Sequence, residues 1–270
     1  GIRRLAVLRA DIDNLGQAFV SGFESEKHGQ KYVTLSRTAT FSRKLALFFK
    51  LHVNTLLQEG EYSLHVNDEA GPRKATIVYS GGDDVFIIGA WDDIIGFAVD
   101  LNDSLGDYAQ GTLTISAGIG IYPEKYPVAA MARQTGELED ASKAYPGKNA
   151  VTLFDESGTY SWDEFINAVL AEKYELIRDF FQTMQDYGKS FLYRLLDLMR
   201  SRDERINLAR YAYLLARMEP GEKAPDENKK LYREFSRKMY QWMLDEKACK
   251  QAITALYIYV YTIRETAEGE

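Results

Sequence analysis

The stretch Ala75-Thr-Ile-Val-Tyr-Ser-Gly-Gly-Asp-Asp-Val-Phe-Ile-Ile-Gly89 decides how this chain folds. Two runs rich in β-branched and aromatic residues flank a Gly-Gly-Asp-Asp connection, which predicts the two strands of a hairpin. Gly81 and Gly82 can adopt positive φ and let a ligand approach the backbone closely. At the tip, the carboxylates of Asp83 and Asp84 repel each other unless a cation neutralises them, and such oxygen ligands suit Mg²⁺ or Mn²⁺. Taken alone, the tetrapeptide is equally typical of a solvated turn.

Size and composition indicate a globular protein without a membrane segment. The 270 residues allow one large domain or two ordinary ones, and 46% hydrophobic with 27% charged residues indicates a soluble chain with an ample core. No apolar run approaches the roughly 20 residues that span a bilayer. No secretory signal precedes the first predicted strand, so we expect a cytoplasmic protein. The start at Gly1, with no Met, favours an excised fragment or a tagged chain.

Cysteine content and net charge narrow the class further. The single Cys249 excludes an intramolecular disulfide and a multi-cysteine zinc site, and it fits a reducing compartment. Its place on a predicted helix favours a buried, inert thiol. The net charge of −7 means that the surface as a whole does not indicate nucleic-acid binding, although a local basic patch remains open.

The first half of the chain alternates strands and helices around the hairpin. A buried strand ends in Asp11-Ile-Asp13, and both acids would point to the same face of that strand. The further elements predicted from apolar periodicity are a helix over 34–57, a helix from Trp91, a strand over 113–121, a helix from Pro127 and a strand over 150–154.

This order predicts an α+β, ferredoxin-like palm with a βαββαβ core, an antiparallel sheet and helices on one face, followed by an appended helix and strand. Such a sheet places the end of the first strand beside the hairpin tip. Asp11 and Asp13 would then meet Asp83 and Asp84 at one metal site, although some 70 residues separate the two pairs.

The character of the sequence changes after Phe154. From there to Thr266 the apolar pattern is helical almost throughout, with its clearest break at Pro220-Gly-Glu-Lys-Ala-Pro225. We predict a bundle of about five helices that carries no chemistry of its own. The predicted domains are a palm over 1–157 and an all-α C-terminal bundle over 158–270.

Ser36 lies near the start of the helix predicted over 34–57. Backbone donors at a helix N-terminus favour anions, so Ser36 could contact a phosphate or a base edge. Capping of the helix by the same hydroxyl is the competing interpretation.

Three motifs occur together and in a characteristic order. They are Asp11-Ile-Asp13, Ser80-Gly-Gly-Asp-Asp84, and Lys143 with Gly147-Lys-Asn149. Over roughly the first 155 residues the chain resembles the polymerase/cyclase palm superfamily, which includes the GGDEF diguanylate cyclases. The joint pattern is far more specific than any one of its parts.

Within that superfamily the chain is most similar to the second palm domain of the large subunit of type III CRISPR–Cas effector complexes. The similarity rests on Tyr79-Ser-Gly-Gly-Asp-Asp84, on Thr34-Leu-Ser-Arg-Thr-Ala-Thr-Phe-Ser-Arg43, and on the helical domain that follows. It implies an ATP-dependent nucleotidyltransferase that makes cyclic oligoadenylates when the complex holds target RNA. The implied partners are ATP, the first palm domain of the same subunit, the small and other subunits of the complex, and guide and target RNA, with no membrane.

The resemblance also implies roles for individual residues. Asp11, Asp83 and Asp84 would be catalytic and would hold one or two Mg²⁺ or Mn²⁺ ions, with Asp13 as a further candidate ligand. The candidate nucleotide-binding residues are Ser36, Ser80, Gly81, Gly82, Lys143 and Lys148. For the two lysines, exposure at a helix end is the competing interpretation.

Differences from the diguanylate cyclases indicate which nucleotide base the site would bind. Those enzymes have Glu in place of Asp84, Phe in place of Val85, and Lys in place of Gly16 followed by an Asn that reads guanine. Here Gln17 follows Gly16, which favours adenine over guanine.

The resemblance also indicates parts that this chain lacks. None of His28, His52 and His65 is followed by Asp, so the His-Asp nuclease site of the family is not in this sequence. No first palm domain precedes Gly1, so we expect half of a composite two-ATP site and an isolated chain that can be inactive. The alternatives are a catalytically silent assembly scaffold, a diguanylate cyclase and, last, a template-directed polymerase, which the acidic balance disfavours.

Overall fold

A computed structural model describes residues 4–24, 27, 29–66, 71–184 and 189–266 in two compact units, Ile2–Trp162 and Asp163–Glu270. The first unit continues past the predicted boundary at residue 157. The reason is strand β6 (Thr159–Ser161), which pairs with β5 (Ala150–Leu153). Trp162 then anchors the end of the unit, because its indole N–H donates to the carbonyl of Ile115 at 2.8 Å.

The first unit is built on a six-stranded sheet in the order β2-β3-β1-β4-β5-β6. The strands not yet given are β1 (Arg4–Ile12), β2 (Ala75–Gly81), β3 (Asp84–Ala90) and β4 (Ile115–Pro123). Strand β1 is antiparallel to both β3 and β4, and β2 is antiparallel to β3, which is the predicted palm core. The appended β5 is parallel to β4.

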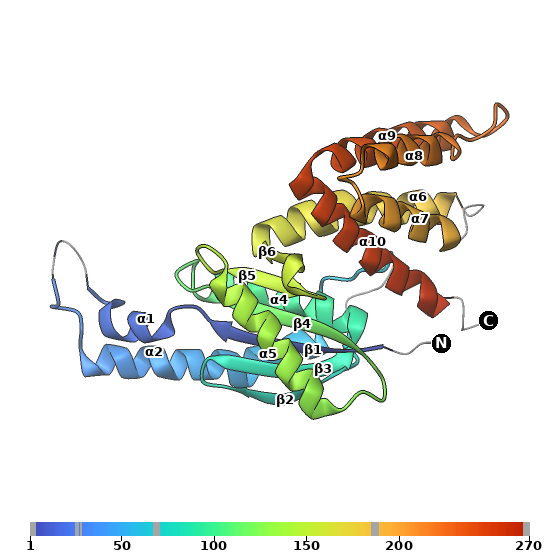
Figure 1. The fold of residues 1–270 in the computed structure, drawn as a ribbon. Helices are drawn as coiled ribbons and strands as arrows, with labels where there is room; N and C mark the ends of the chain where they lie inside the picture. The colour runs from blue at the N-terminus through green and yellow to red at the C-terminus, as the bar shows by residue number, and fades with distance from the viewer. Residues whose placement is uncertain (1–3, 25–26, 28, 67–70, 185–188, 267–270) are drawn as a thin grey trace. The chain divides into compact units, whose positions relative to one another are not determined.

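Helices cover both faces of this sheet (Figure 1). The βαββαβ core contributes α2 (Leu35–Leu47), η1 (Phe48–His52), α3 (Val53–Gln58) and α4 (Trp91–Tyr108). The short α1 (Leu15–Ser21) precedes them. The appended α5 (Val128–Ala144) crosses the opposite face, where its Met131 packs with Val7 of β1 and Tyr122 of β4. The predicted α+β palm followed by a helical region is therefore confirmed, and α5 gives the sheet a second covered face.

Alternation along β1 explains why both faces are apolar. Leu8 is fully buried on one side of the strand, and Val7 is fully buried on the other. Near the end of the strand the α5 side becomes polar, because Arg9 and then Asp11 follow Val7 at intervals of two residues. The polar end of this face is where the predicted site residues lie.

The hairpin turns within two residues, Gly82 and Asp83. Gly82 has φ 72°, whereas Asp83 does not have a positive φ, so Gly occupies the first central position as in a type II′ turn. The β2–β3 register shifts between Ile77 and Tyr79, which is the signature of a β-bulge.

The second unit is all-helical within its described residues. Its first helix runs from η3 (Glu164–Tyr174), a π-helical segment, directly into α6 (Glu175–Thr183). The others are α7 (Lys189–Arg200), α8 (Arg205–Ala216), α9 (Asp226–Leu244) and α10 (Glu246–Thr266). Phe180 stacks on Phe235 in its core, with centroids 3.8 Å apart. Cys249 is buried, as predicted.

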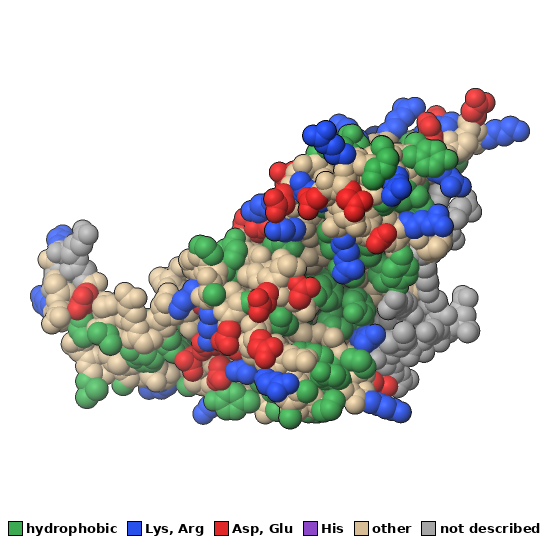
Figure 2. Space-filling model, in the orientation of Figure 1, with side chains coloured by type: hydrophobic (Ala, Val, Ile, Leu, Met, Phe, Trp, Pro, Cys, Tyr) green, Lys and Arg blue, Asp and Glu red, His purple; other side chains and the backbone are tan. Residues whose placement is uncertain are grey.

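Within the described ranges, no helix combines the length and apolar character needed to cross a bilayer. Figure 2 shows acidic and basic side chains interspersed over both units on the face in view.

Candidate functional site

The end of β1 and the tip of the β2–β3 hairpin lie side by side. Asp11 stands directly opposite Asp84 in the β1–β3 ladder. One residue further, the backbone N–H of Ile12 donates to the carbonyl oxygen of Asp83 at 3.1 Å. The structure thus brings together the three acids that the sequence separates by about 70 positions.

Charge repulsion acts within this carboxylate cluster of Asp11, Asp83 and Asp84. The pKa of Asp83 is raised, first by partial burial and then by the negative charges of Asp11 and Asp84. Lys143 opposes the rise but does not cancel it. The cluster therefore carries more negative charge than its neighbours neutralise, which is the condition that favours an added cation.

Lys143 places a positive charge beside the cluster. It lies in the last turn of α5 and forms ion pairs with Asp11 and, at 2.9 Å, with Glu139. Burial lowers the pKa of Lys143, but the hydrogen bonds to Asp11 and Glu139 outweigh that effect and raise it. Lys143 is therefore a permanent ammonium at neutral pH, placed at the edge of the carboxylates.

The carboxylate cluster fits a hard divalent cation in donor type and in charge. Carboxylate oxygens are the ligands that Mg²⁺ and Mn²⁺ prefer, and Lys143 pairs directly with Asp11 and lowers the pKa of Asp83 without cancelling its rise. Over the described part of the chain, no three His, Cys, Asp or Glu side chains are gathered around a single metal position. In this structure the carboxylate of Asp11 is instead neutralised by its ion pair with Lys143.

Asp13 has a different environment from the cluster. The residue is 5% exposed, and its carboxylate accepts hydrogen bonds from the hydroxyl of Ser116 at 2.7 Å, the hydroxyl of Thr114 at 2.8 Å and the backbone N–H of Asn149 at 2.9 Å. Strand β1 has already ended at Ile12. The geometry favours a role for Asp13 in joining β1, β4 and the loop before β5 over the predicted role of metal ligand.

The loop that Asp13 holds contains the second candidate lysine. Gly147, Lys148 and Asn149 all have positive φ, at 87°, 56° and 50°. Lys148 donates from its ammonium to the side-chain oxygen of Asn14 at 2.8 Å, so it reaches the segment directly after β1. The structure therefore brings Lys148 to the end of β1 that carries Asp11 and Asp13.

Ser80, Gly81 and Gly82 form the rim of the hairpin. The hydroxyl of Ser80 donates to the carbonyl of Phe49 in η1 at 2.7 Å, which ties the hairpin to the helix. A side chain at Gly82 would meet no atom within 4 Å, so its backbone faces open space. The rim thus leaves room for a ligand at Gly82, while Ser80 is engaged by the protein itself.

Ser36 is not brought to the hairpin. It is exposed in the first turn of α2, and Figure 1 shows that this turn lies at the end of the helix away from the sheet. The helix is capped by Thr34, whose hydroxyl accepts from the N–H of Arg37 at 3.4 Å. The capping interpretation of Ser36 is therefore wrong, and its nucleotide contact stays a prediction.

Three residues without a predicted role border the carboxylates. Arg9, Tyr79 and Glu139 line a hollow of about 210 Å³ together with Asp84. The pKa of the Tyr79 hydroxyl is raised, chiefly by the negative charge of Asp84. The sequence did contain a signal for Glu139, because it precedes Lys143 by four positions on a predicted helix.

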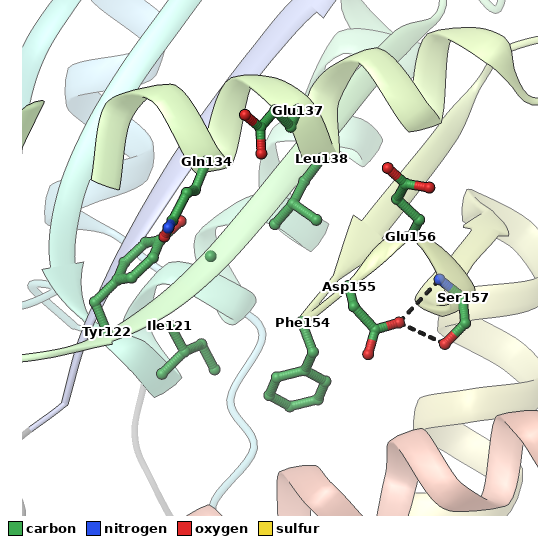
Figure 3. Close-up of a pocket in the computed structure, with 10 residues that line it drawn as sticks. Ile121, Tyr122, Gln134, Glu137, Leu138, Phe154, Asp155, Glu156 and Ser157 are labelled. Atoms are coloured by element: carbon green, nitrogen blue, oxygen red, sulfur yellow. Dashed lines mark hydrogen bonds between the residues drawn. The ribbon is translucent and has the colours of Figure 1, made fainter. Parts of the chain in front are cut away.

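A larger hollow of about 520 Å³ lies elsewhere, between β4, α5 and the segment after β5 (Figure 3). It is lined by apolar and acidic side chains. In it, Asp155 accepts hydrogen bonds from the backbone N–H and the hydroxyl of Ser157. None of the predicted site residues lines this hollow.

Comparison with known families identifies the class. The strand order and the acids at the hairpin define a palm-type domain. Residues 4–152 match the family Cas10/Cmr2, second palm domain, and residues 178–265 match the second helical domain of the CRISPR RNA silencing complex Cmr2 subunit. The chain belongs to the Cas10/Cmr2 family, and the predicted resemblance is confirmed.

Relatives at higher identity come from type III-A CRISPR systems. A Cas10/Csm1 protein of Mycobacterium tuberculosis, described as a CRISPR system single-strand-specific deoxyribonuclease, is 48% identical over 98% of this chain and 32% of its own length. A protein of the same description from Streptococcus thermophilus is 42% identical over 98% of this chain and 33% of its own length. The chain thus spans about a third of the curated relatives that it matches.

Solved structures share the fold. A crystal structure of a Csm1–Csm4 cassette in complex with one ATP has TM-score 0.63 and 26% identity, and covers 94% of this chain and 36% of that one. A Csm1–Csm4 cassette in complex with cA3 has TM-score 0.60 and 26% identity, with 92% and 36% covered.

Proposed function

We propose that this chain is the nucleotidyltransferase palm of a type III CRISPR large subunit, and that it joins ATP molecules through 3′–5′ linkages into cyclic oligoadenylate. The observation that carries the proposal is the meeting of Asp11 with Asp83 and Asp84, beside the Lys143 ammonium. Related structures support the choice of substrate, since they are described as complexes with ATP and with cA3.

The environment of α1 supports adenine over guanine. The guanine-reading Asn of the diguanylate cyclases is replaced by Gln17 in the resemblance described above. Phe19 on the same helix packs edge-on against Phe41 of α2, with ring centroids 4.9 Å apart. The surface near Gln17 is thus partly apolar, whereas the diguanylate cyclases have a Lys and a guanine-reading Asn in this segment.

The proposed mechanism relies on alignment and charge, because phosphoryl transfer needs little covalent help from the protein. Asp11, Asp83 and Asp84 would hold one or two divalent ions. Bound Mg²⁺ or Mn²⁺ would supply charge neutralisation at the phosphates and a lower pKa for the attacking ribose hydroxyl. Lys143 would bind a substrate phosphate, and the open backbone at Gly82 would admit the nucleotide.

The proposed partners follow from the family. A first palm domain of the same subunit would complete a two-ATP site, and the helical unit would pack along the small subunits. Guide RNA and target RNA would act through the assembled complex, where target RNA would switch synthesis on. The His-Asp nuclease motif is absent from this sequence, so the proposal does not include the deoxyribonuclease activity in the names of the relatives.

The deciding experiment is synthesis by the assembled complex with target RNA, ATP and Mg²⁺. We expect Asp83→Asn with Asp84→Asn to reduce cyclic oligoadenylate at least roughly 100-fold, the scale on which a positioned electrostatic group contributes to catalysis. The matched control is Asp103→Asn with Asp107→Asn, which removes the same charge from exposed positions of α4. Undiminished synthesis in the first variant would refute the site and leave an assembly scaffold.

A parallel titration separates the two bases. Calorimetric binding of ATP and GTP to the full-length subunit, with and without Mg²⁺, should give metal-dependent ATP binding that the Asp83/Asp84 variant loses. Turnover of GTP to a cyclic dinucleotide would contradict the adenylate proposal and restore the diguanylate cyclase.

A further inference from the structure

Glu139 lies in the middle of a chain of ion pairs that ends in the carboxylate cluster. One of its oxygens pairs with the guanidinium of Arg9 at 3.1 Å, and the other pairs with the ammonium of Lys143 at 2.9 Å. Lys143 in turn pairs with Asp11. Four charges of alternating sign therefore run from the middle of β1, through α5, to the end of β1.

The position of Glu139 is fixed more rigidly than that of the other members. Its side chain is 7% exposed, whereas those of Arg9 and Lys143 are 39% and 32% exposed. Its backbone presses on Gly118 of β4, where an added Cβ would lie 2.4 Å from the nitrogen of Glu139. One turn further, the Ser142 hydroxyl donates to the carbonyl of Ala117 at 2.6 Å. These contacts hold this part of α5 against β4.

We infer that Glu139 is the positioning residue that holds Lys143 in place to receive a substrate phosphate. The inference rests on the proposed function of the palm. Lys143 is held from two sides, but one of its partners, Asp11, is also a proposed metal ligand. Glu139 is not a proposed metal ligand, so its pair with Lys143 persists whether or not Asp11 binds a metal.

The competing account is that Glu139 only neutralises the two cations that surround it. The two accounts differ in whether the length of the side chain at position 139 matters. Neutralisation needs a negative charge near Arg9 and Lys143, and Glu139→Asp retains that charge. Positioning needs the carboxylate to reach the ammonium, and Glu139→Asp withdraws it by one methylene group.

The test is calorimetric ATP binding, in the presence of Mg²⁺, to the full-length subunit and its variants. We expect both Glu139→Gln and Glu139→Asp to weaken ATP binding by about tenfold, the scale of one hydrogen bond to a charged group. The exposed neighbour provides the control, because Asp140→Asn removes a charge one residue away and should leave the affinity unchanged. Thermal unfolding of each variant identifies any loss caused by misfolding.

A double-mutant cycle tests whether Glu139 acts through Lys143. Lys143→Ala should weaken ATP binding at least as much as Glu139→Gln, and the double variant should be no weaker than Lys143→Ala alone. Losses that multiply in the double variant would overturn the inference, as would wild-type affinity in Glu139→Asp. In either case the proposed function stands, whereas a wild-type subunit that binds no ATP would overturn both.

Discussion

Tyr79 reaches the carboxylates from the neighbouring strand. The bulge in β2 brings it level with Phe86, and its hydroxyl donates to the carbonyl of Gly81 at 3.2 Å. Asp84 lies close enough to raise its pKa. Tyr79 is thus placed to brace both the turn and one acid of the cluster.

Removal of this hydroxyl should impair synthesis without affecting folding. We expect Tyr79→Phe to lower cyclic oligoadenylate synthesis roughly threefold to tenfold, since one hydrogen bond contributes about 0.5–1.5 kcal/mol. The melting temperature of the variant should not change, because Tyr79 as a residue is 52% exposed. Tyr108→Phe is the control, since that hydroxyl also donates to a backbone carbonyl, of Lys44. A wild-type rate in Tyr79→Phe would exclude the bracing role.

At the scale of residues, the sequence was informative where topology alone sets the neighbours. The meeting of Asp11 with Asp83 and Asp84 follows from strand order, so it could be predicted. The environment of Asp13 could not, because its partners come from β4 and from the loop at Asn149. A hydrogen-bond partner so distant in sequence leaves no local pattern.

At the scale of elements, the packing of α5 on β4 sets the position of Lys143, because Lys143 lies in the last turn of α5. Gly118 leaves no room for a Cβ, since Thr135 and Glu139 of α5 lie against it. We expect Gly118→Ala to destabilise the palm by about 1–3 kcal/mol through overpacking, and to weaken ATP binding because Lys143 moves with the helix. Denaturant unfolding and calorimetry measure the two effects.

The control substitution should change the stability of the palm in the opposite direction. Gly106 lies inside α4, and an added Cβ there would meet nothing within 4 Å. Gly106→Ala should therefore stabilise the palm by about 0.5–1 kcal/mol through helix propensity and leave ATP binding unchanged. Equal effects of the two alanines would contradict the packing argument.

A pH-dependent pair joins two helices of the second unit. Glu172 of η3 pairs with its neighbour Lys173 at 3.0 Å and with Lys238 of α9 at 2.8 Å. Burial raises the pKa of Glu172, but the hydrogen bonds from Lys238 and Lys173 outweigh it and lower the pKa below 4.5. A lowered folded-state pKa means that the pair stabilises the unit above pH 4.5, and that this contribution is lost as pH falls through the folded value.

We therefore expect Glu172→Gln to destabilise the unit at pH 7 and to match the wild type in acid. Because the Glu172 side chain is 40% exposed, solvent screening limits the effect to at most about 1 kcal/mol. Unfolding free energies between pH 3 and pH 7 measure it. The exposed Glu175 provides the control, since Glu175→Gln should show no such pH dependence. A stability difference between Glu172→Gln and the wild type that grows as the pH falls would contradict the predicted direction of this pH dependence.

Elements with a buried face were predictable, and elements without one were not. The helix over 34–57 appeared in the apolar pattern and is observed as α2, η1 and α3. Helix α1 was not predicted, because it has only seven residues and none of them is buried. Strand β6 was also missed, since three residues are too few to show alternation.

At the scale of the whole molecule, each unit has its own core. Phe235 is fully buried in the helical unit, so Phe235→Ala should cost that unit about 3–5 kcal/mol. Because Phe235 contributes nothing to the palm core, ATP binding should not change. Hydrogen exchange resolved by segment, together with calorimetry, measures both effects.

A second substitution, in the core of the palm, tests the independence of the two cores from the other side. Phe97 of α4 is fully buried in the palm. Phe97→Ala should remove protection from the palm and abolish ATP binding, while protection of the helical unit is retained. Loss of protection in both units from either substitution would show that they unfold as one.

The hydrogen bonds of Asp13 also bear on the order in which the protein is made and folds. Asp13 leaves the ribosome 136 residues before its partner Asn149. Contacts between such distant residues form late, because a long loop must close first. We therefore expect the loop that carries Lys148 to be fastened late, once β4, α5 and β5 have been made, and the nascent palm to complete its proposed nucleotide site as one of its last folding steps. ATP present during synthesis would therefore stabilise finished palms alone and leave incomplete ones unaided.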